Sequence, residues 1–147
     1  MSERTVFSLR ASKDTLRTLQ EEARRYGVPP RTLAERMIEE GVKMRRHPGV
    51  VFIDRGGGRS AVLAGRPRLG IWQIVQVVRA NRTRAAAARW LSLDEGSIDR
   101  AIAYAKEYPD DIEQAIRHND EAFERVERRY PSSASLMSGR RRAARSR

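Results

Sequence analysis

The chain opens with an alternation of side chains that is typical of a half-buried β-strand. One face of an extended backbone would carry the mainly apolar positions Thr5, Phe7, Leu9 and Ala11. The other face would carry Arg4, Val6, Ser8 and Arg10. The pattern predicts a short strand at the N-terminus, apolar on one side and basic on the other.

After this strand the period changes to that of two amphipathic helices. Ser12 is a good N-cap residue and Gly27 a good stop, so a helix is predicted between them. Proline is favoured at the first position of a helix, so a second helix is predicted to begin at Pro30. The predicted apolar faces carry Leu16, Leu19, Ala23 and Tyr26, then Leu33, Met37, Ile38 and Val42. One strand and two short helices bury too little apolar area alone, so we expect two copies to pair their strands in an obligate homodimer.

This arrangement resembles the ribbon–helix–helix DNA-binding domains of Arc, MetJ and CopG. The resemblance rests on Phe7-Ser8-Leu9-Arg10, Ser12, Tyr26-Gly27 and the two apolar helices. In that family a two-stranded ribbon lies in the major groove of double-stranded DNA. The resemblance therefore implies an operator-binding dimer. The alternative is an amphipathic hairpin that serves only for dimerisation.

The family's outward strand positions, which contact DNA bases, correspond here to Val6, Ser8 and Arg10. Arg10 would bind a guanine with two hydrogen bonds, and Ser8 would be able to contact any of several bases. Val6 would contact a thymine methyl or contribute nothing. Phosphate contacts are expected from Arg4 and from Arg31 and Thr32 at the start of the second helix.

Beyond a boundary at Pro48-Gly49, the pattern predicts a hairpin followed by helices. Apolar runs at 50–53 and 61–64 flank a glycine-rich loop at 54–58. Helices are expected from Ile71 to a break at Asn81-Arg82 and at 84–91, then one capped by Ser92 or Asp94, then one from Pro109 to about Tyr130. The fold class is mostly α, with domains at 1–47 and 48–131 and a disordered basic tail at 132–147.

The second domain resembles a small domain of VapB-like antitoxins. The matching stretches are Leu63–Leu69 and Ser97–Ala105. The resemblance implies a β-hairpin with a winged-helix-like cluster, and pairing with a toxin, typically a PIN-like ribonuclease encoded nearby. A second DNA contact through Arg82, Arg84 and Arg89 is an alternative, and packing or protein contact is the favoured interpretation of this cluster.

Charge and composition limit the function classes. The net charge is +11, and residues 1–48 contribute +4, residues 49–131 contribute +2 and residues 132–147 contribute +5. The basic excess therefore lies at the two ends and suggests a polyanion partner. The chain has no Cys, and its two histidines, His47 expected in a linker and His118 expected on the exposed side of a helix, lack metal-ligand spacing. We expect no enzyme activity, no cofactor, no metal and no membrane segment, and a cytoplasmic, nucleoid-associated location.

Together these patterns predict the antitoxin of a type II toxin–antitoxin system. It would repress its own operator as a dimer and neutralise a partner toxin. The alternatives are a stand-alone repressor or plasmid-partition regulator, and an interaction module without an operator.

Overall fold

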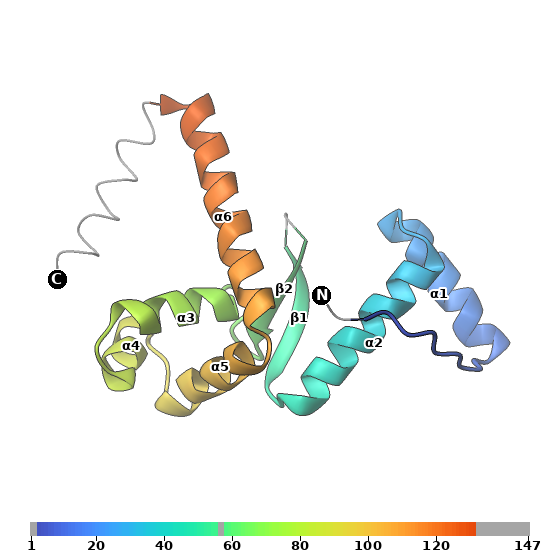
Figure 1. The fold of residues 1–147 in the computed structure, drawn as a ribbon, viewed down its shortest axis with the longest axis horizontal. Coiled ribbons are helices and arrows are strands. Elements are labelled where there is room, and N and C mark those ends of the chain that lie inside the picture. The colour runs from blue at the N-terminus through green and yellow to red at the C-terminus, as the bar shows by residue number, and fades with distance from the viewer. Residues whose placement is uncertain (1–2, 56–57, 132–147) are drawn as a thin grey trace. The chain divides into compact units, whose positions relative to one another are not determined.

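The computed structural model describes residues 3–55 and 58–131, and the fold of this part of the chain is mostly helical (Figure 1). The chain divides between Lys43 and Met44 into two compact units, called here the N-terminal and C-terminal units. The described elements are α1 Lys13–Tyr26, α2 Pro30–Arg46, β1 Val50–Arg55, β2 Gly58–Leu63, α3 Ile71–Ala80, α4 Arg84–Leu91, α5 Glu95–Glu107 and α6 Pro109–Arg129. The basic tail expected at 132–147 lies outside the described residues.

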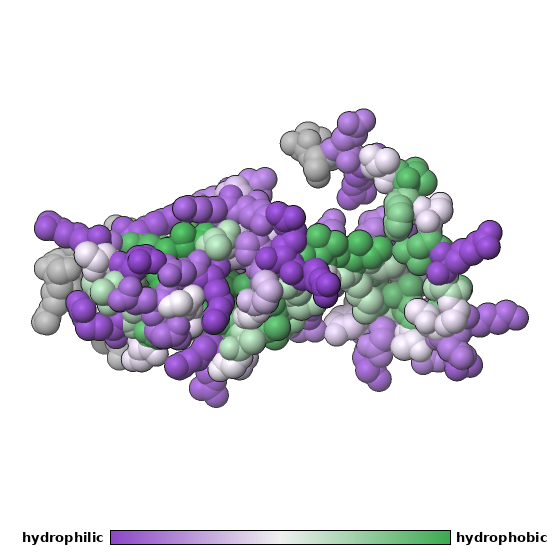
Figure 2. Space-filling view, turned by 90° about the horizontal axis from the view of Figure 1, so that it is seen from below, coloured by the Kyte–Doolittle hydropathy of each residue, from purple (hydrophilic) through white to green (hydrophobic). Residues whose placement is uncertain are grey.

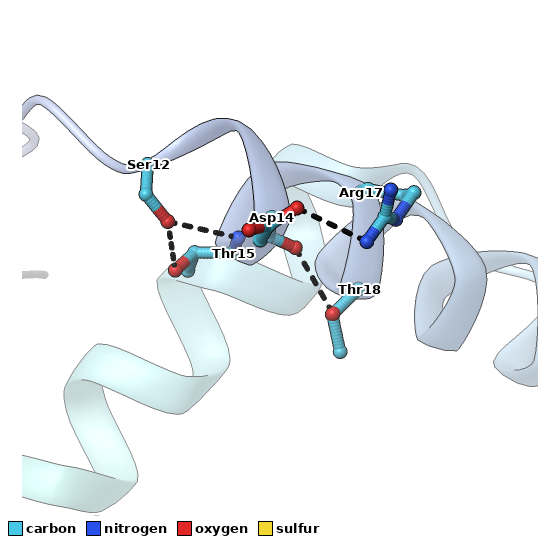
Figure 3. A network of polar contacts seen from close by, with 5 residues as sticks. All are labelled: Ser12, Asp14, Thr15, Arg17 and Thr18. Carbon is cyan, nitrogen blue, oxygen red and sulfur yellow. Dashed lines mark hydrogen bonds and ion pairs between the residues drawn. The ribbon is translucent and has the colours of Figure 1, made fainter.

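Helix α1 begins and ends at the residues that the sequence predicts. The Ser12 side chain accepts a hydrogen bond from the Thr15 amide at 3.1 Å, as the close view in Figure 3 shows. Gly27 ends the helix at φ +66°, a left-handed conformation that glycine adopts without steric cost. Both predicted caps are confirmed, because capping depends only on residues close together in the chain.

The hairpin is longer than the apolar runs predict. Strands β1 and β2 pair antiparallel from Val50 opposite Leu63 to Arg55 opposite Gly58. Asp54 and Arg55, expected in the loop, therefore lie in β1. The strand pairing continues past the last apolar residue of β1, because backbone hydrogen bonds do not require apolar side chains. An ion pair between Asp54 and Arg59, at 3.3 Å, also links the two strands near the turn.

The helices of the C-terminal unit follow their caps. Thr83 caps α4 through a hydrogen bond from the Ala86 amide. Of the two candidates for the next cap, Asp94 is the N-cap of α5, whereas Ser92 ends α4 in a left-handed conformation. Pro109 begins α6 as predicted. Helix α3 packs against α4, α5, α6 and β2, so it is the central element of this unit.

The core of the C-terminal unit is built around fully buried side chains of α3, α5 and the hairpin. They include Tyr104, Ile71, Ile74, Ile98, Val50 and Val62. The Tyr104 hydroxyl, the polar end of this buried side chain, donates a hydrogen bond to Asp111 Oδ2 at 2.6 Å. The ring of Tyr104 also meets His47, Phe52 and Tyr108 at centroid distances of 5.1–6.4 Å. His47, expected in an open linker, is therefore part of the packed unit.

We predict that Ile98→Ala lowers the free energy of unfolding of the C-terminal unit by about 2–5 kcal/mol, because it leaves a cavity where the side chain is fully buried. Urea unfolding of the full chain measures this change. Val126→Ala is the control: its side chain is 49% exposed, and the expected change is within about 0.5 kcal/mol. Equal effects of both substitutions would contradict the assignment of the core.

Candidate nucleic-acid interface

The segment that carries the predicted base contacts forms no regular secondary structure in the single chain. Residues 3–12 are exposed throughout, with Val6 at 89% and Phe7 at 78%. A strand needs a neighbour whose backbone groups complete its hydrogen bonds. No described segment of the same chain takes that place, so strand formation here stays a prediction that depends on a second copy.

All four predicted contact residues of this segment are open to solvent. Val6, Ser8 and Arg10 alternate along it and Arg4 precedes them. The segment leads directly to Ser12, the N-cap of α1, so the predicted base-contact residues lie immediately before a well-defined helix. Their placement in a major groove stays a prediction.

The N-terminal unit leaves much of its apolar surface uncovered. Among its described residues only Ala23 and Leu33 are buried. Of the other residues on the predicted helix faces, Leu19 is partly buried, and the rest are about half exposed: Leu16, Tyr26, Met37, Ile38 and Val42. The space-filling view shows green, apolar surface open to solvent (Figure 2). Exposed apolar surface of this extent is typical of sites that contact a protein, a membrane or a ligand.

The start of α2 presents the two remaining predicted phosphate contacts. Arg31 and Thr32 are exposed in the first turn, and that turn holds no acidic residue. The first intrahelical hydrogen bond runs from the Leu33 amide to the Pro29 carbonyl. Arg31 makes an exposed ion pair with Glu35 at 3.0 Å. Such a pair contributes only about 0.2–0.5 kcal/mol, so a phosphate can compete for the guanidinium.

Several arginines of the C-terminal unit are engaged within it. Arg84 forms an ion pair with Asp99, which raises the pKa of Arg84 above its usual value. Arg79 contacts Glu113 at 2.5 Å. The alternative of a second DNA contact relied on Arg84 together with Arg82 and Arg89. This pair is exposed and therefore weak, so the stronger reason against the alternative is the nearly balanced charge of residues 49–131.

A polar cluster ties the end of α2 to α5 inside the C-terminal unit. Glu107 bonds Arg46 through one carboxylate oxygen and His47 Nε2 through the other, the latter at 2.7 Å. The hydrogen bond from Arg46 lowers the pKa of Glu107, and His47 adds to the effect. Sequence reasoning missed this cluster because its partners are sixty positions apart. The position of His47 directly after a helix was the one local signal.

Asp94 shows a second lowered carboxyl pKa. The Ser97 hydroxyl donates to one oxygen at 2.7 Å and the Ser97 amide to the other at 2.8 Å. These hydrogen bonds favour the ionised form of Asp94 and lower its pKa. The environment is that of a helix cap, which needs no catalytic role to explain it.

Neither a metal site nor a membrane helix is present among the described residues. No group of three or more His, Cys, Asp or Glu side chains there could hold a metal ion. None of the described helices is both long and apolar enough to cross a membrane. Comparison of the chain with protein-family models, curated proteins and solved structures found no match.

We predict that acid weakens the fold partly through Glu107. Its pKa is lower in the folded protein than in the unfolded chain. The contact therefore contributes stability above the unfolded-state pKa, and this contribution disappears as the pH falls through the folded-state pKa. Glu107→Gln should be less stable near neutral pH but should lose less stability between about pH 6 and about pH 3.

Urea unfolding of both proteins across this pH range measures the difference. The acid sensitivity that remains in Glu107→Gln is expected to include the contribution of Asp94, whose pKa is also lowered. An identical pH dependence of the two proteins would exclude a stabilising role for the ionised Glu107.

Proposed function

We propose that this chain is a homodimeric, operator-binding regulator of the ribbon–helix–helix type, and that it acts as an antitoxin. The observation that carries the proposal is the combination in the N-terminal unit of uncovered apolar helix faces and an exposed, arginine-bearing segment before α1. The first feature calls for a second copy, and the second supplies the groups that bind DNA.

The need for a second copy follows from burial. Two helices that bury only Ala23 and Leu33 within the described chain lack a core of their own. Pairing residues 4–10 of two copies would complete the hydrogen bonds of both strands at once. It would also place Phe7 and Leu9 of each copy on the helix side of the ribbon, where they would cover the apolar faces of α1 and α2.

DNA recognition would then use the opposite side of the ribbon. Arg10 and Ser8 would reach base edges, with Val6 beside them, while Arg4, Arg31 and Thr32 would hold phosphates. The C-terminal unit would bind the toxin rather than DNA. Residues 49–131 hold 14 basic and 12 acidic residues, and this nearly balanced charge favours a protein partner over a phosphate backbone.

The toxin assignment is tested by co-expression with the neighbouring genes. The tagged full chain should co-purify in fixed stoichiometry with a small protein that is toxic when expressed alone, such as a PIN-like ribonuclease. Elution of the chain with itself alone would exclude the antitoxin function and leave a stand-alone repressor.

For the dimer, we predict opposite outcomes for two adjacent acidic substitutions. Leu9→Glu would put a charge on the buried side of the ribbon and should yield monomers. Ser8→Glu adds the same charge on the outward side. It should stay dimeric but lose DNA binding, because the acid repels phosphate. Analytical ultracentrifugation and fluorescence anisotropy with DNA from upstream of the gene distinguish the two. Dimeric Leu9→Glu would exclude the ribbon.

For DNA recognition, we predict that Arg10→Ala costs about 1–3 kcal/mol of operator binding and relaxes selectivity at one position. Arg31→Ala removes the same charge at a predicted phosphate contact. It should weaken operator and scrambled DNA alike and reduce the salt slope by about 1. Titrations at several salt concentrations measure both. Equal affinity of the native protein for operator and scrambled DNA would exclude base readout.

A further inference from the structure

The apolar side of α6 continues well beyond the core that its first turns join. Ile112 is buried and Ile116 packs on the core. The same side of the helix then carries Asn119, Phe123 and Val126, and Tyr130 follows as the C-cap residue; we call these four residues the α6 stripe. These positions follow one another at alternating intervals of three and four residues. That spacing is the one by which a helix presents a continuous seam to a partner.

The second half of the α6 stripe is open to solvent. Val126 is 49% exposed and Tyr130 58% exposed, while Phe123 is partly buried. In Figure 1 the later turns of α6 run beyond α3, α4 and α5, all of the same unit. Phe123, Val126 and Tyr130 stand at the spacing i, i+3, i+7, which is typical of a helix that binds in an apolar groove.

The charge of α6 differs from that of the rest of the chain. The helix holds seven acidic and four basic residues, a net charge of −3 in a chain of +11. Asp120 and Glu127 lie along one flank of the stripe, in line with Glu113. The opposite flank carries the small residues Ala115 and Ala122 and, in the last turn, Arg129. The stripe is thus bordered by acid on one side, and on the other side it is open to close approach along Ala115 and Ala122.

This border argues against a second copy of α6 as the occupant. In a parallel pair of helices, Asp120 and Glu127 would face Ala115 and Ala122 of the other copy. In an antiparallel pair the acidic flanks would face one another. Neither arrangement forms an ion pair across the seam. A groove of another protein with Lys or Arg along one rim satisfies both the apolar stripe and its acidic flank.

We propose that the α6 stripe docks a partner protein through an apolar groove with a basic rim on one side. The identity of this partner as the toxin rests on the proposed function. The side chains that enter the groove are Phe123, Val126 and Tyr130, and Asp120 and Glu127 pair with the rim. Helix α6 is then the main toxin-binding element of the C-terminal unit.

The test uses the full chain and, as probe, the purified product of the adjacent gene. Val126→Glu should weaken the complex at least about tenfold, because it puts a charge into the groove. Gln114→Glu is the matched control: it adds the same charge at an exposed position on the opposite side of α6 and should leave the affinity unchanged. Asp120→Lys combined with Glu127→Lys should weaken binding and reduce its salt dependence.

Binding to upstream DNA and thermal unfolding of each variant check that the chain remains folded. A partner that binds native protein and Val126→Glu equally well would overturn the α6 proposal and leave the antitoxin function intact. An adjacent gene product that does not bind the native chain would overturn both. Hydrogen exchange of the free protein tests two other occupants of the α6 stripe, residues 132–147 and a second copy of the chain.

If α6 amides are protected and this protection is lost when residues 132–147 are deleted, that segment is the occupant and the proposal is overturned. If the protection is lost on dilution to monomers, a second copy is the occupant and the proposal is likewise overturned.

Discussion

The shortage of apolar burial in the N-terminal unit is the constraint that shapes this protein. Two helices alone cannot enclose a core, and here they bury Ala23 and Leu33 while Met37, Ile38 and Val42 stay about half exposed. The C-terminal unit differs, because α3 is surrounded by α4, α5, α6 and β2. One unit can therefore fold by its own contacts, and the other is expected to become stable only when a second chain covers it.

Ion pairing distinguishes the C-terminal unit from the exposed segment before α1. In the C-terminal unit, Arg46, Arg79 and Arg84 form ion pairs with Glu107, Glu113 and Asp99, respectively. In the N-terminal segment, Arg4 and Arg10 are exposed beside few acidic residues. This distribution is the physical basis for proposing DNA at one unit and a protein at the other, although both belong to one strongly basic chain.

The two histidines show how far side-chain surroundings escape sequence reasoning. His118 lies on the exposed side of α6 as expected, because helical periodicity alone places it there. His47 was expected in a linker but meets Tyr104, Tyr108 and Glu107, which approach it only when α5 packs. Tyr104 is fully buried, although the apolar pattern of this helix predicts Ile98, Ile102 and Ala105 as its inward positions. Its hydroxyl donates a hydrogen bond to Asp111, which satisfies this polar group inside the core.

By itself, the sequence determined the features that depend on neighbours along the chain: the caps Ser12, Gly27 and Thr83, the order of helices and the hairpin. Tertiary structure decided the choice of Asp94 over Ser92 as the cap of α5 and the extension of the hairpin. It also decided which side chains form the core. The reason is physical. Caps and helical periods arise from hydrogen bonds between residues a few positions apart. Burial depends on contacts between segments far apart in the sequence, and no local pattern specifies these contacts.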